Sequence, residues 1–64
     1  MNQIEVYLQP GGWVARYKGP HAAKVRDLFG TDVLPTAFTA QADSEKVRTA
    51  IQQLNPGVAV TVQS

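Results

Sequence analysis

The chain has 64 residues, of which 44% are hydrophobic and 17% are charged, and its net charge at pH 7 is +1. This length allows one domain, which we expect to span residues 1–64. Six Lys and Arg residues against five Asp and Glu residues exclude the dense positive surface that binds nucleic acids by charge alone.

The first two predicted elements are strands that form a hairpin. Apolar and polar residues alternate through residues 4–9, and residues 13–18 follow as a second strand-like run. The intervening Pro10-Gly11-Gly12 predicts a tight turn, with either Pro10-Gly11 or Gly11-Gly12 as its two-residue loop. Either loop predicts one face that is buried, formed by Ile4, Val6, Leu8, Trp13, Ala15 and Tyr17. The opposite face then carries Glu5, Tyr7, Val14, Arg16 and Lys18.

A helix and a short strand are predicted next. Pro20 favours the first position of a helix that runs to Phe29, because proline there lacks only a donor that has no partner. Gly30 is expected as its left-handed C-cap. Pro35 favours an extended backbone, so we expect a third strand over residues 36–40.

The second helix is predicted from Asp43, which is typical of an N-cap, to Asn55-Pro56-Gly57, which ends it. Alternating valines then predict a final strand over residues 58–62. The expected fold is a small ββαβαβ domain of the α+β class. Its sheet has three or four strands, is mostly antiparallel, and carries two helices packed on one face. The expected core consists of Ile4, Val6, Leu8, Trp13, Tyr17, Phe29, Phe38, Val47, Ile51, Leu54, Val58, Val60 and Val62.

The residue types do not favour catalysis. His21 is the only side chain that titrates near neutral pH unperturbed, and only chance placement of Asp27 or Asp32 would orient its imidazole. We therefore expect His21 to be an exposed residue of the first helical turn and the protein not to be an enzyme.

Cofactors and membranes are not expected either. The absence of cysteine excludes disulfides and thiolate zinc sites, and the spacing of the carboxylates matches no calcium loop, so we expect no metal and no other cofactor. No apolar run approaches the roughly 20 residues of a membrane span, and no signal-peptide pattern is present. We expect a cytoplasmic protein that does not contact membranes.

The outward face of the predicted hairpin is the candidate binding surface. Tyr7 between Arg16 and Lys18 can stack on an unpaired base while the cations neutralise its phosphate. The alternative is a solvated face on which Glu5 pairs with Arg16 or Lys18 across the strands. Val14 is an outward apolar residue that fits a self-association patch.

One segment resembles a known family. Asp32-Val33-Leu34-Pro35, followed by residues 36–45 and a helix through Ile51, is similar to the core of HicB-type antitoxins, in which an Asp-Leu-Pro turn precedes a short strand and a capped helix. The segment Gly12-Trp13-Val14-Ala15 is similar to the glycine-aromatic second strand of that family. The resemblance implies a partner-binding fold that occludes a small RNase.

The chain also departs from that family. Its predicted helix over residues 22–29 is additional, Thr36 and Ala37 stand where the family often has glycine, and Lys46-Val47 replaces an acidic residue and an alanine. These 64 residues contain no helix-turn-helix or ribbon-helix-helix segment that would bind an operator.

The function expected from the sequence is a non-enzymatic binding module whose partner is a protein, as for an antitoxin. Two alternatives stay open. The first is single-stranded nucleic-acid binding through Tyr7, Arg16 and Lys18. The second is a homodimer joined at a sheet edge, since an unpaired edge invites another strand.

Overall fold

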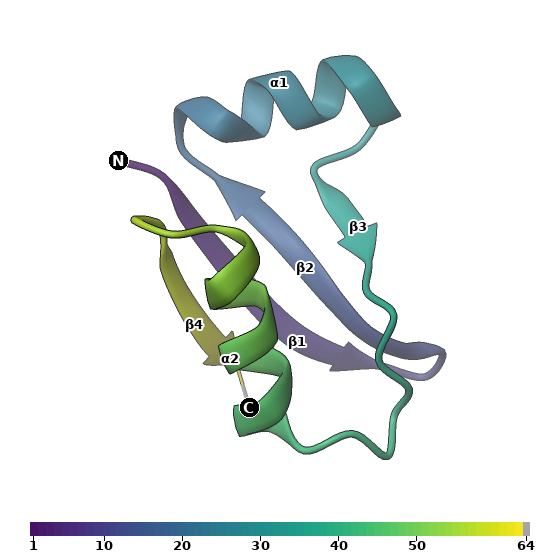
Figure 1. Ribbon diagram of the computed structural model, residues 1–64. Coiled ribbons are helices and arrows are strands. Elements are labelled where there is room, and N and C mark those ends of the chain that lie inside the picture. Colours follow the sequence, from purple (N-terminus) through teal and green to yellow (C-terminus); the bar gives the residue numbers. More distant parts are fainter. Residues whose placement is uncertain (64) are drawn as a thin grey trace.

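In the computed structural model, which describes residues 1–63, the chain forms one four-stranded sheet and two helices (Figure 1). The strands are β1 (Gln3–Gln9), β2 (Gly12–Lys18), β3 (Val33–Pro35) and β4 (Ala59–Gln63), and the helices are α1 (Pro20–Phe29) and α2 (Ser44–Leu54). The strand order is β3-β2-β1-β4. The β1–β2 and β2–β3 pairs are antiparallel, whereas β1 and β4 are parallel. The predicted α+β class and ββαβαβ order are therefore confirmed.

The hairpin of β1 and β2 has the predicted division into two faces. Gln9 pairs with Gly12, which makes Pro10-Gly11 the two-residue loop. In this register Ile4 is opposite Tyr17 and Val6 is opposite Ala15, so the apolar residues share one face. This face holds the core of the protein.

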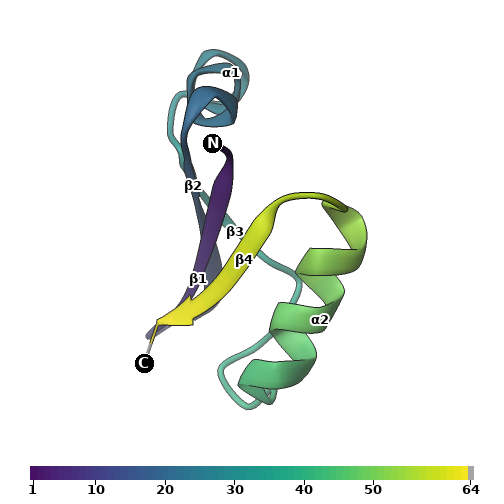
Figure 2. The same ribbon diagram turned by 90° about the vertical axis from the view of Figure 1, so that its left-hand side faces the viewer.

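Helix α2 covers that face of the sheet, as Figure 2 shows. The Asp43 side chain accepts a hydrogen bond from the main-chain N–H of Lys46, which satisfies one of the free donors of the first turn. Val47 and Ile51, four residues apart, are buried against the sheet. Helix α2 lies between β3 and β4 in the chain, and it packs against β4 at one edge of the sheet.

Helix α1 corrects the expectation that both helices pack on one face. Figure 2 shows α1 beyond the end of the sheet, away from α2. Only Gly19 separates β2 from α1, so the helix starts where the strand stops and packs at that end of β2. Its proline start and its left-handed Gly30 C-cap are as predicted.

The third strand was predicted too late in the chain. It occupies Val33–Pro35, not residues 36–40. The main-chain N–H of Thr36 donates to the carbonyl of Trp13, and the N–H of Trp13 donates to the carbonyl of Phe38. Since both bonds go to one residue of β2, the segment after Pro35 turns around the start of β2 instead of extending its ladder.

The core is smaller than predicted. Its central cluster consists of Ile4, Val6, Trp13, Ala15, Val47, Ile51 and Val60, with Tyr17, Phe38, Val58 and Val62 partly buried against it. Three residues expected in the core are exposed, with exposed fractions of 50% for Leu8, 62% for Phe29 and 76% for Leu54. Phe29 is exposed because α1 lies at the end of the sheet and does not pack on the core face.

Candidate interaction face

The second face of the sheet is not covered by a helix within residues 1–63 (Figure 2). We call it the open face. It is formed by the residues that alternate with the core positions in all four strands, namely Gln3, Glu5, Tyr7, Gln9, Val14, Arg16, Lys18, Val33, Pro35, Ala59, Thr61 and Gln63. The four residues singled out from the sequence, Tyr7, Val14, Arg16 and Lys18, all lie on it.

One row across the open face is largely apolar. Tyr7 of β1 is directly opposite Val14 of β2, and Val14 is opposite Pro35 of β3. Gln63 of β4 completes the row beside Tyr7. Tyr7 and Val14 are half-buried by their neighbours, so an aromatic ring and two aliphatic side chains form a continuous strip over three strands.

The next row carries charge. Glu5 is opposite Arg16 in the register, yet its carboxylate binds Lys18, whose Nζ donates to Oε2 over 3.2 Å. With the Gln63 amide nitrogen turned toward Glu5, it donates to the two carboxylate oxygens at 3.0 and 3.2 Å. Glu5 is thus held by side chains from β2 and β4.

Arg16 is exposed, and no side chain among the described residues forms an ion pair or a hydrogen bond with its guanidinium group. Its five N–H donors face solvent in a planar arrangement that matches a carboxylate or phosphate. Arg16 is therefore the cation of the open face that is available to a partner.

A polar hollow of about 400 Å³ adjoins the open face at the end of β2. Arg16 and Lys18 border it, as do Arg26 of α1 and Asp32. Arg26 Nη1 donates to Asp32 Oδ2 over 3.0 Å. Three cations thus surround the hollow, but two of them already have a carboxylate partner.

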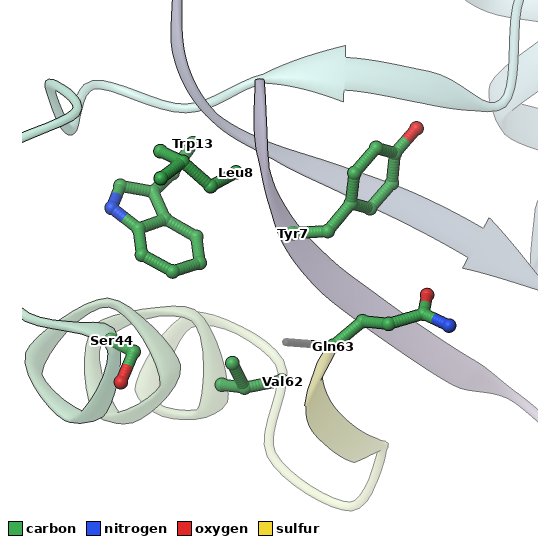
Figure 3. Close-up of a pocket in the computed structure, with 6 residues that line it drawn as sticks. All are labelled: Tyr7, Leu8, Trp13, Ser44, Val62 and Gln63. Atoms are coloured by element: carbon green, nitrogen blue, oxygen red, sulfur yellow. The ribbon is translucent and has the colours of Figure 1, made fainter. Parts of the chain in front are cut away.

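A second, mainly apolar hollow of about 480 Å³ lies where β4 ends beside β1. Tyr7, Leu8, Trp13, Ser44, Val62 and Gln63 line it. Figure 3 shows Tyr7 and Gln63 on one side of β1 and Trp13, Leu8 and Ser44 on the other. The hollow therefore joins the rim of the open face to the exposed part of the core.

His21 and Asp32 have different partners in the structure. The His21 ring packs edge-to-face against Tyr17, with ring centroids 5.3 Å apart, and Asp32 binds Arg26. The part of the chain that the structure describes contains no group of three or more His, Cys, Asp or Glu residues placed to hold a metal ion. Within residues 1–63, no helix combines the length and the apolar character that a membrane span requires.

Sequence reasoning found the hairpin part of the open face but not its outer strands. Pro35, Thr61 and Gln63 come from distant parts of the chain, and only the strand register places them beside Val14, Glu5 and Tyr7. The alternation of residues 58–62 predicted that alternate residues share one face, but it did not predict which strand would lie beside them.

Comparisons with known protein families, with curated proteins and with solved structures found no match for this chain.

Proposed function

We propose that this chain is a non-enzymatic binding module that contacts a protein partner through the open face. The observation that carries the proposal is the apolar strip of Tyr7, Val14 and Pro35 next to the unpaired guanidinium of Arg16. Tyrosine and arginine are enriched at the centres of protein interfaces, where they contribute most of the binding energy.

The distribution of charge favours a protein over a nucleic acid. Lys18 is bound to Glu5 and Arg26 to Asp32, which leaves Arg16 as the free cation of this region among the described residues. Single-stranded nucleic acids need several free cations along the path of the backbone, in addition to aromatic rings. The partner that complements the open face has an apolar patch and a carboxylate opposite Arg16.

The resemblance of residues 32–51 to HicB-type antitoxins suggests one class of partner, a small RNase. The chemistry of the open face requires that such an RNase present an apolar patch and a carboxylate opposite Arg16. The proposal for the open face does not depend on this class.

The test is a capture experiment with matched variants. The tagged wild-type chain, Arg16→Ala and the control Lys46→Ala are incubated with lysate of the source organism, with and without nuclease treatment. Captured proteins are identified by mass spectrometry. Lys46 is exposed on α2, behind the opposite face of the sheet, and its replacement removes the same charge. We expect a protein that wild type and Lys46→Ala capture and that Arg16→Ala does not.

The captured protein is then purified, and its affinity for the three chains is measured by calorimetry. Arg16→Ala should weaken binding about tenfold or more, as expected for a central interface arginine. Equal affinity of all three chains would refute the open face as the binding surface. Capture that is lost on nuclease treatment would instead support single-stranded nucleic acid. Arg16→Glu with Lys18→Glu should then abolish binding to an oligonucleotide.

A further inference from the structure

The two edges of the sheet are protected to different degrees. At one edge, β3 has three residues and ends in Pro35, which has no N–H to offer to another strand. At the other edge, β4 has five residues, Ala59–Gln63, and contains neither proline nor a charged side chain. Figure 1 shows β4 at the margin of the sheet. It lacks the sequence features that normally prevent an edge strand from pairing.

The sequence of β4 is complementary to itself in an antiparallel pair. If a two-fold axis passes through Thr61, Val60 is opposite Val62 of a second copy, and Ala59 is opposite Gln63. Thr61 is opposite Thr61, a pair that forms favourable contacts in sheets. No like charges meet in this register, and three of its five residue pairs consist of two β-branched residues. This self-complementarity distinguishes a second copy from an arbitrary strand.

We infer that two copies of this chain associate through β4, in antiparallel register about Thr61, to form a continuous eight-stranded sheet. The two-fold axis is perpendicular to the sheet, so both copies of α2 lie on one side of it. The open faces of the two copies then join into one surface on the other side. The inference rests on the edge strand and is independent of the proposed partner.

Self-association is tested with the purified chain alone, so that its failure leaves the proposed partner binding untouched. Sedimentation equilibrium over a hundredfold range of concentration should show a mass that rises from 6.9 kDa to twice that value. Amide hydrogen exchange provides a measurement that needs no variant. Main-chain amides of β4 that face outward should become more protected as the concentration rises.

Variants at Thr61 test the register. Thr61→Lys places two ammonium groups opposite each other and should weaken the dimer about tenfold or more. Thr49→Lys, at an exposed threonine on α2, adds the same charge and should leave the dimer unchanged. A mixture of Thr61→Lys and Thr61→Glu should form a one-to-one heterodimer, because opposite charges then meet at the axis.

The inference is overturned by a constant mass of 6.9 kDa over the whole concentration range. It is also overturned if Thr61→Lys, folded by circular dichroism, dimerises as strongly as wild type, since the interface would then lie elsewhere. Failure of the Lys and Glu variants to form a heterodimer would refute the register about Thr61. If Thr61→Lys does not fold, the concentration dependence of β4 protection in wild type decides.

Discussion

The indole Nε1–H of Trp13 donates a hydrogen bond to the main-chain carbonyl of Ala42 over 3.1 Å. This bond joins the start of β2 to the residue that precedes the N-cap of α2. The carbonyl of Trp13 also accepts from both the N–H and the hydroxyl of Thr36, at 3.0 and 2.8 Å. The N–H of Trp13 donates to the carbonyl of Phe38 as well. Trp13 therefore holds the connection between β3 and α2 at three residues, Thr36, Phe38 and Ala42, which positions α2 over the sheet.

Trp13→Phe should lower the free energy of unfolding by about 1–3 kcal/mol, because it removes the donor to Ala42 and part of a buried ring. Urea unfolding followed by far-UV circular dichroism measures the loss. In Trp13→Phe, amide exchange should accelerate more in the first turn of α2 than in the β1–β2 hairpin, relative to the wild type. Uniform exchange changes across the chain would contradict the role of Trp13 in holding α2.

Gly12→Ala should destabilise the fold by about 1–3 kcal/mol, whereas Gly11→Ala should change it by less than about 1 kcal/mol. Gly12 has φ 132°, and an added Cβ would lie 2.8 Å from the carbonyl oxygen of Phe38. Gly11 has open space around an added Cβ and no positive φ. The two variants are compared by urea unfolding. Similar losses for both would show that the approach of Phe38 to Gly12 does not matter.

Ile4→Ala should cost about 2–5 kcal/mol, a large part of the roughly 3–10 kcal/mol expected for a chain of this size. Leu8→Ala should cost clearly less, although both residues are apolar and belong to the same face of β1. Ile4 is fully buried, whereas Leu8 is half exposed. Thermal and urea unfolding of the two variants test this order, and a larger loss for Leu8→Ala would contradict it.

Asp43→Ala should lower the free energy of unfolding by about 1 kcal/mol, because the free N–H of Lys46 loses its acceptor at the start of α2. Asp43→Asn keeps an oxygen acceptor at this position and should retain most of that stability. The comparison of the two variants by urea unfolding isolates the cap from the charge. Equal losses would show that the carboxylate charge, and not the cap bond, stabilises α2.

Arg48 should lower the pKa of Glu45 in the folded chain. The hydrogen bonds from Arg48 Nε to the carboxylate, at 2.9 and 3.2 Å, and then the attraction between the charges hold the pKa of Glu45 below its ordinary value. Because the pKa is lower in the folded state than in the unfolded state, the pair stabilises the fold above the unfolded pKa. This contribution is lost as the pH falls through the folded pKa.

The prediction is measured by an NMR titration of the Glu45 carboxyl carbon. In Arg48→Gln the pKa of Glu45 should rise toward its ordinary value. Lys46→Gln, a neighbouring cation on the same helix, should leave the pKa low. An identical titration of Glu45 in the wild type and in Arg48→Gln would contradict the pairing.

The sequence predicted the parts of the fold that depend on neighbouring residues. Period-two alternation placed β1 and β2, while Pro20 and Gly30 bounded α1, and Asp43 marked the start of α2. Each of these signals acts over a few residues, through the backbone conformation and the first hydrogen bonds. The common face of Tyr7, Val14, Arg16 and Lys18 followed from the same alternation.

Other features depended on segments that are far apart in the chain. The turn of residues 36–38 around Trp13 ended β3 at Pro35, and the parallel pairing of β1 with β4 brought Gln63 to Glu5. Phe29 is exposed because α1 lies at the end of the sheet, a position that the sequence pattern of the helix does not predict.

Local sequence by itself thus determined the two strands of the hairpin, the two helices, and which residues of the hairpin share a face. The tertiary structure alone decided the strand order, the apolar positions left exposed, and the rows that cross the open face. The physical reason is that capping and periodicity are short-range effects. Strand register and burial, in contrast, are set by the packing of all elements together.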